Sequence, residues 1–381
     1  MKHLVLTNGI IGSMFILFAF LIMGNAQANG ACDAYLSQAD FDPQLAIFDS
    51  LEISKPGIYC LQEDISIAYP GSIANHLNLP PGIGVITPAI KILSPDVSLE
   101  FDGHIIDNKQ RFDHPEDDVI AIQIRYNPLP TNGINDQTVI RDGQINGFSR
   151  GGIDASYSDT QFNWAPQPAE LLIMNMIISE SNDAAITVSS GINITIEQNR
   201  FENNAAAIQM SNVENVQIIS NQIETSTVQF PCCRGVVDID ISESSNVEII
   251  NNTLQSDEFV LHQDFTTGIQ TNFVDNYAIK NNTINGYYYG IYSVQDAIGS
   301  IEDNNITSDI FSGTPTQTLT THGLAIYQPS GVDLIGNDLA KVEVGIELIN
   351  PPLSALPSTV TNNRICLSSQ PIVWIPVPGG P

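Results

Sequence analysis

Basic residues are scarce in this sequence, which has 13 Lys and Arg against 42 Asp and Glu and a formal net charge of −29. Such an acidic surface repels nucleic acids and anionic lipids, so we expect neither as a partner. The acidic surface would also repel a polyanionic polysaccharide, so electrostatic binding of such a ligand would require bound cations. The same acidity is equally what keeps an exported protein soluble, and it does not by itself indicate a ligand.

Beyond its first residues the chain lacks an apolar run that could span a membrane, which takes about 20 residues. Residues 1–28 instead have the pattern of a signal peptide. Lys2 precedes the 14-residue apolar run Ile10–Met23, and the small-x-small sequence Ala26-Gln27-Ala28 follows. We therefore expect a secreted protein, periplasmic, extracellular or on the cell surface, whose mature chain has no membrane span.

Cysteine is also sparse, with five residues in 381. Because export favours disulfides, we expect Cys32 and Cys60 to pair and to staple the region ahead of the first repeat. Cys366 and Cys232 lie about four repeats apart, or roughly 20 Å at the spacing of β-strands. That separation exceeds the reach of a disulfide, so one thiol is expected to stay free.

What the chain does contain is a repeat of short strands. Apolar and polar residues alternate in INITIEQNRF, VENVQIISNQI, SNVEIINNTL, NYAIKNNTI and IEDNNI. Alternation indicates a strand with one solvated face, and its return every 22 to 33 residues indicates a unit stacked on itself. One asparagine marks each copy, in the series Asn175, Asn199, Asn221, Asn252, Asn282, Asn304, Asn337 and Asn363.

A second series of strands runs beside the first, from Ala-Ile-Lys-Ile at 89–92 to Gly-Ile-Glu-Leu at 345–348. Its ten copies interleave with the asparagine series in constant order. The unit is too short for a propeller blade and lacks helical spacing, which excludes propellers and helical repeat arrays. The repeat predicts an all-β, right-handed parallel β-helix (solenoid) of about ten coils with N- and C-terminal caps. We expect a cap at 29–84, the β-helix at 85–366 and a Pro-rich tail or cap at 367–381.

These segments resemble a known family. The run from Lys55, KPGIYCLQEDI, followed by AIKILSPDVSLEFDGHII, is similar to the opening of right-handed parallel β-helix proteins of the pectin-lyase-like superfamily. The repeats SSNVEIINNTL and NYAIKNNTI are similar to its typical coils. The resemblance covers residues 51–366 and implies the fold. The superfamily includes hydrolases, lyases, epimerases and adhesins, so it implies no single activity.

The outward positions of the second series are unusually polar, and tyrosines flank them. They include Arg125, Asp154, Gln209, Gln270, Asn272, Tyr292 and Tyr327. Amides, carboxylates and hydroxyls suit sugar hydroxyls, and tyrosine rings suit sugar faces. We therefore expect these residues to bind a polysaccharide or a cell-surface glycan, although an ordinary solvated sheet face has the same pattern.

Asp238 and Asp240 are the candidate catalytic residues. Two positions apart on one strand, they are expected to point the same way with Cα atoms about 6.6 Å apart. This is near the separation at which one carboxyl acts as acid while the other activates water. The pair could instead hold Ca²⁺, and no other cofactor is indicated.

Two function classes follow from the sequence. The first is a pectin-lyase-like glycoside hydrolase or polysaccharide lyase, and the second is a non-catalytic, adhesin-like or structural β-helix protein. The polygalacturonases of the superfamily carry Asn-Thr-Asp, Asp-Asp, Gly-His-Gly and Arg-x-Lys motifs. None is complete here, so that activity is not transferred. We expect a monomer.

Overall fold

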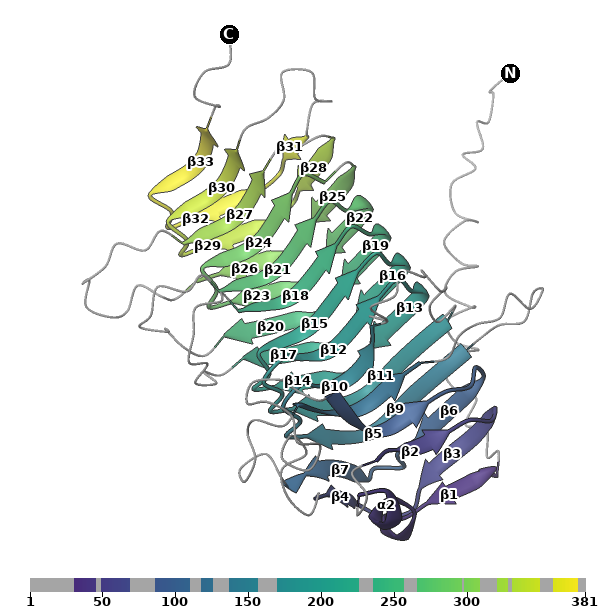
Figure 1. Ribbon diagram of the computed structural model, residues 1–381. Coiled ribbons are helices and arrows are strands. Elements are labelled where there is room, and N and C mark those ends of the chain that lie inside the picture. Colours follow the sequence, from purple (N-terminus) through teal and green to yellow (C-terminus); the bar gives the residue numbers. More distant parts are fainter. Residues whose placement is uncertain are drawn as a thin grey trace, which may run out of the picture.

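The computed structural model describes residues 31–45, 49–68, 86–109, 118–125, 137–156, 170–225, 236–256, 266–296, 298–308, 321–327, 331–349 and 359–375. The expected signal peptide at 1–28 lies outside these residues. Nearly all regular structure in the described residues is parallel β-strand, and the strands stack into one elongated coil (Figure 1).

One side of the coil is a 12-stranded parallel sheet in the described residues, which we call sheet one. In spatial order it contains β2 (Leu51–Ile53), β5 (Ile86–Ile92), β8 (Asp118–Ile124), β10 (Gly151–Ala155), β12 (Ala184–Ser189), β15 (Ala206–Ser211), β18 (Val237–Ser242), β21 (Thr267–Asn272), β24 (Tyr289–Val294), β27 (His322–Tyr327), β30 (Val344–Ile349) and β33 (Gln370–Ile375). The ten middle strands are the ten copies of the second sequence series.

The other strands form two further stacks. Sheet two contains β1 (Ala34–Leu36), β3 (Gly57–Leu61), β6 (Val97–Glu100), β9 (Gln137–Asn146), β11 (Glu170–Ser179), β13 (Ile192–Glu197), β16 (Glu214–Ile219), β19 (Ser245–Ile250), β22 (Asp275–Lys280), β25 (Gly299–Glu302), β28 (Val332–Ile335) and β31 (Val360–Thr361). Sheet three contains β4 (Ile65–Ile67), β7 (Ile105–Asn108), β14 (Arg200–Glu202), β17 (Gln222–Thr225), β20 (Thr253–Ser256), β23 (Thr283–Asn285), β26 (Asn305–Thr307), β29 (Asp338–Ala340) and β32 (Arg364–Cys366). The long strands β9 and β11 belong to both stacks and join them.

The solenoid extends past the boundaries expected from the sequence. β2 pairs with β5 ahead of residue 85, and β33 pairs with β30 beyond residue 366. Their sequences, LEI and QPIVWI, do not carry the Ala-Ile or Gly-Ile signature of the other rungs. At the N-terminal end the helix α2 (Gln38–Leu45) packs against the stack and buries Phe41 and Leu45 (Figure 1).

A buried asparagine ladder joins consecutive coils, as the marker series predicts. Asn199, Asn221, Asn252, Asn282 and Asn304 are each 1 or 2 % exposed. Each side-chain amide donates to the Oδ1 of the next asparagine at 3.0 to 3.1 Å and to a backbone carbonyl. That Oδ1 also accepts the backbone N–H of the preceding asparagine. The ladder therefore satisfies buried backbone groups at one bend of each coil that it joins.

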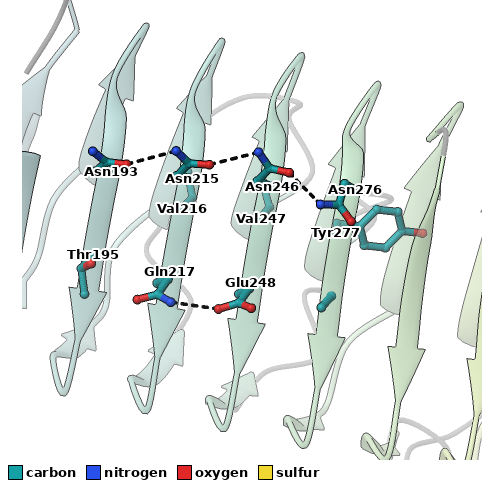
Figure 2. A pocket seen from close by; sticks show the side chains of 11 residues that line it. Asn193, Thr195, Asn215, Val216, Gln217, Asn246, Val247, Glu248, Asn276 and Tyr277 are labelled. Carbon is teal, nitrogen blue, oxygen red and sulfur yellow. Dashed lines mark hydrogen bonds between the residues drawn. The ribbon is translucent and has the colours of Figure 1, made fainter. Parts of the chain in front are cut away.

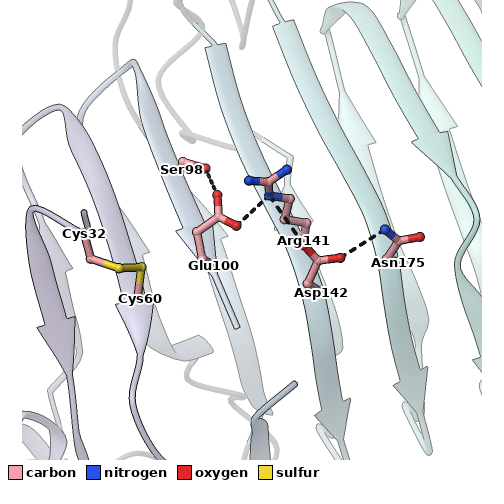
Figure 3. A network of polar contacts seen from close by, with 7 residues as sticks. All are labelled: Cys32, Cys60, Ser98, Glu100, Arg141, Asp142 and Asn175. Atoms are coloured by element: carbon pink, nitrogen blue, oxygen red, sulfur yellow. Dashed lines mark hydrogen bonds and ion pairs between the residues drawn. A yellow bond between two sulfur atoms is a disulfide. The ribbon is translucent and has the colours of Figure 1, made fainter. Parts of the chain in front are cut away.

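The marker at Asn175 is wrong by one residue. β11 and β14 pair Ile178 with Phe201, so Met176 occupies the ladder position, and its backbone N–H donates to Oδ1 of Asn199 at 2.9 Å. Asn175 instead has a left-handed backbone and donates to Asp142, in a network that continues through Arg141 and Glu100 (Figure 3). β11 keeps one constant register with β9 and with β13 and β14, so it contains no extra residue, and Asn175 is simply the left-handed residue directly before the ladder position.

The predicted disulfide is confirmed. Cys32 and Cys60 are bonded across a separation of 28 residues, at the N-terminal end of sheet two (Figure 3). Cys366, on β32, is a free and exposed thiol. Cys232 lies outside the described residues. No helix of the described part is long and apolar enough to cross a membrane.

Candidate functional site

The outward positions of sheet one form a continuous register with one side chain per rung, of which Gln123, Ala325 and Glu347 are buried. The outward row runs through Glu52, Lys91, Gln123, Asp154, Thr187, Gln209, Asp240, Gln270, Tyr292, Ala325, Glu347 and Val373. Rungs of a parallel sheet are about 4.8 Å apart, so the row spans roughly 50 Å. Ten of its twelve members are polar or aromatic with a hydrogen-bonding group. We call it the outward row.

Toward the N-terminal end of the outward row lies a cavity of about 140 Å³. Three of the predicted binding residues, Arg125, Asp154 and Gln209, line it. Arg150 and Asp183 line it too, with Arg150 Nε 3.8 Å from Asp183 Oδ2. The sequence patterns did not single out these two residues, because they lie in the turns before β10 and β12. The cavity thus combines two guanidinium groups with two carboxylates.

Asp240 lies in the middle of the outward row, between Gln209 and Gln270. Its side chain is partly exposed, and Gln270 Nε2 donates to its Oδ1 at 3.4 Å. Partial burial raises the pKa of the carboxyl. Asp240 is therefore an accessible carboxyl flanked by amides, which can accept hydrogen bonds from a ligand on this face.

Asp238 does not share that surface, and the expectation that both carboxyls point the same way is wrong. Asp238 is 0 % exposed, and its carboxylate accepts hydrogen bonds from Thr225 Oγ1, at 2.6 and 2.8 Å, and from the hydroxyl of Tyr287. It stands at the rung position that Gly268 and Gly290 fill in the next two coils, where a Cβ would point at core side chains. Strict alternation fails at this strand start, so the carboxyl points inward. Burial raises its pKa to about 6.

The arrangement also gives no support for Ca²⁺ at the aspartate pair. Among the described residues, the His, Cys, Asp and Glu side chains that gather in a group of three or more close enough to share an ion are Cys32, Cys60 and Asp102. The two cysteines of that group are bonded to each other.

An aromatic cluster, which we define as Tyr288, Tyr289, Tyr292 and His322, lies toward the C-terminal end of the outward row. The rings of Tyr289 and His322 are stacked with centroids 4.8 Å apart, and Tyr288 lies 5.6 Å from the same imidazole. Tyr292 lies 5.1 Å from Tyr289. Burial raises the pKa of all three phenols, so they are hydrogen-bond donors at neutral pH.

Glu347 closes this cluster on the next rung. Its Oε2 lies 2.8 Å from Nδ1 of His322, an ion-pair distance, although the two atoms do not meet the angular requirement of a hydrogen bond. The two side chains are only 11 % and 9 % exposed. Burial lowers the pKa of His322 to about 4 and raises the pKa of Glu347.

The remaining predicted residues lie beside this face. Asn272 and Tyr327 belong to a parallel row two positions further along each strand, separated by Val294. Oδ1 of Asn272 is buried without a hydrogen-bond partner. His322 and Glu347 were not predicted as site residues, and the run Tyr287-Tyr288-Tyr289 is the sequence signal that could have indicated this region.

The fold and the outward row define the class of this molecule: a right-handed parallel β-helix with a mostly polar and aromatic row of side chains along one sheet. The family described as a right-handed β-helix region matches residues 131–264. The resemblance to pectin-lyase-like β-helices is thereby confirmed as a resemblance of fold.

Solved structures with a similar fold share little sequence with this chain. DFA-IIIase from Arthrobacter chlorophenolicus A6, without its lid and in complex with GF2, is 12 % identical with a TM-score of 0.47, over 77 % of this chain and 82 % of that one. The periplasmic alginate epimerase AlgG is 12 % identical with a TM-score of 0.46, over 84 % and 86 %. The A-module of a mannuronan C-5 epimerase from Azotobacter vinelandii is 13 % identical with a TM-score of 0.41, over 86 % and 93 %. The comparison with curated protein sequences gives no match.

Proposed function

We propose that this is an exported protein that binds a polysaccharide along the outward row of sheet one. The observation that carries the proposal is the register of this row, which repeats a polar or aromatic side chain at every coil over most of the molecule. A polymer of repeating polar units is the ligand class that such a repeating surface matches. The disulfide between Cys32 and Cys60 supports export, because disulfides persist in oxidising compartments.

The middle of the row and the aromatic cluster toward its C-terminal end support different parts of this interaction. The amide and carboxyl groups of Gln209, Asp240 and Gln270 can bond sugar hydroxyls as donors and acceptors. The rings of Tyr289 and Tyr292 offer partly exposed faces on which a sugar ring can stack. Removing the Tyr292 ring should weaken binding about fivefold to tenfold, the effect of one aromatic contact.

The test is retention of the purified mature chain on immobilised glycans, neutral and anionic, with and without Ca²⁺. Wild type should be retained on at least one glycan, and Tyr292→Ala combined with Asp240→Ala should lose that retention. Gln222→Ala is the matched control, because Gln222 is exposed on sheet three, away from the outward row. Equal retention of the double variant and wild type would refute binding on this face.

Turnover at the aromatic cluster is the second candidate function, favoured by the contact between His322 and Glu347. Imidazole and carboxyl groups with shifted pKa values beside phenol donors are the components of acid–base catalysis, as in a polysaccharide lyase or hydrolase. Asp240 and Glu347 are four rungs apart, roughly 19 Å. That is too far for the paired carboxyls of an inverting hydrolase, which need about 6.5–9.5 Å.

Product analysis separates these candidates. New reducing ends alone indicate hydrolysis, and 4,5-unsaturated ends indicate elimination. His322→Gln should keep glycan retention but lower turnover by at least about 100-fold, the usual contribution of a general acid or base. Retention without any product, from wild type, would leave the non-catalytic binding protein.

A further inference from the structure

Sheet two carries a second groove that the proposed function does not use. It has a volume of about 420 Å³ and runs across β13, β16, β19 and β22, on a different side of the coil from the outward row (Figure 2). One wall is a row of four exposed asparagines, Asn193, Asn215, Asn246 and Asn276, and the other includes Gln217 and Glu248. This groove is larger than the cavity of about 140 Å³ on sheet one.

The four asparagines are bonded into a polar chain along the groove. Asn215, Asn246 and Asn276 each donate from Nδ2 to Oδ1 of the preceding asparagine, at 3.1, 3.0 and 2.6 Å (Figure 2). An amide nitrogen carries two hydrogens and an amide oxygen two lone pairs, so each amide keeps one donor and one acceptor for a ligand. These pairs recur at the rung spacing of about 4.8 Å.

Backbone conformation alone does not account for this row. All four asparagines have positive φ, from 55° to 58°, which asparagine tolerates well. Other bends of the coil place Ser190, Glu243 and Phe273 in the same conformation, with φ between 49° and 60°. The left-handed backbone therefore accepts several residue types in this chain, and among the left-handed positions of the described residues asparagine fills four successive rungs only along the groove.

The negative charge of the groove indicates which class of ligand it can bind. Glu248 is the charged group in its lining, and Gln217 Nε2 donates to it at 2.9 Å. The lining holds no cation, and the whole chain has a net charge of −29. An anionic polymer would be repelled here. From these observations we infer that the groove on sheet two is a second binding site, for an uncharged linear polysaccharide.

Affinity electrophoresis in native gels tests this site. The gels contain a soluble neutral polysaccharide, either mixed-linkage β-glucan, galactomannan or xyloglucan, and parallel gels contain alginate or polygalacturonate. The variant Asn215→Gly/Asn246→Gly removes two amides but keeps a residue that accepts positive φ. Asn212→Gly/Asn251→Gly is the matched control, because both residues are exposed at φ of 53° and 58° outside the groove.

Wild type and the matched control should be retarded by at least one neutral polysaccharide, and the groove variant should bind it about tenfold more weakly. Tyr292→Ala/Asp240→Ala should keep this retardation, which separates the groove from the outward row of sheet one. Circular dichroism checks that each variant is folded. Absence of retardation by every neutral polysaccharide, or equal retardation of the groove variant, would overturn the inference. Retardation by anionic polymers alone would overturn its ligand class.

Discussion

Asp238→Asn is expected to change how stability depends on pH. The buried carboxyl of Asp238 has its pKa raised by burial from the ordinary value of 3.8 to about 6. Between these values the folded protein binds a proton that the unfolded chain does not, so stability falls as pH rises from about 4 to 6. At 1.36 kcal/mol per pH unit, the loss reaches about 3 kcal/mol by pH 7.

Asparagine has nearly the same shape and stays neutral, so it avoids this loss. The hydroxyls of Thr225 and Tyr287, which donate to the carboxylate, can also accept from the new amide group. We therefore expect Asp238→Asn to become more stable than wild type by up to about 3 kcal/mol as pH rises from 4 to 7.

Urea unfolding at pH 4, 5, 6 and 7, followed by circular dichroism, measures the effect as the difference between the two proteins. This difference removes the contribution of other buried carboxyls such as Asp296, which both proteins share. Asp275→Asn, at an exposed position on β22, is the control. A difference that stays constant across this pH range would refute the reasoning, and loss of glycan retention in Asp238→Asn would contradict a purely structural role.

Three further outcomes are expected. Asn252→Ala leaves buried backbone groups unpaired and should destabilise the protein by about 2–4 kcal/mol, measured by urea unfolding. Asn246→Ala, in the row of exposed asparagines along the groove on sheet two, should cost about 1 kcal/mol or less. Equal effects of the two substitutions would contradict the argument that burial of the ladder makes it stabilising. Replacing both Cys32 and Cys60 with serine opens a loop of 28 residues and should lower the free energy of unfolding by about 3–4 kcal/mol. The loss should appear as faster hydrogen exchange in β1 and β3, and unchanged exchange would refute this prediction. Chelation by EDTA should leave glycan retention unchanged if Asp240 binds sugar without Ca²⁺, and lost retention that Ca²⁺ restores would contradict this.

Sequence periodicity was sufficient to predict the fold because each coil repeats the same alternation of buried apolar and solvent-exposed polar residues. The asparagine series fixed the bends, and the Ala-Ile and Gly-Ile series fixed the rungs of sheet one. The end strands β2 and β33 were missed because each has a neighbour on one side, so their sequences follow a weaker pattern. Asn175 was taken as the marker because it is the asparagine of its repeat, although it lies one residue before the ladder position that Met176 occupies.

The candidate site was less predictable than the fold. The outward row followed from alternation, and Gln209, Asp240, Gln270 and Tyr292 lie on it in register. Asp238 was misplaced because alternation breaks where a strand leaves a bend. The contact between His322 and Glu347 joins residues 25 apart in sequence, on adjacent rungs. No local pattern indicates it before the register is known.

The strict stacking of coils has a consequence for how this molecule can change in evolution or design. Neighbouring ladder asparagines are separated by as few as 22 and as many as 33 residues, yet make the same contacts. A tandem duplication of one such segment would insert a complete coil and lengthen both the outward row and the groove on sheet two by about 4.8 Å. The length of polymer that these surfaces can contact is therefore set by a whole number of coils. Gene duplication can change that number without a redesign of the core.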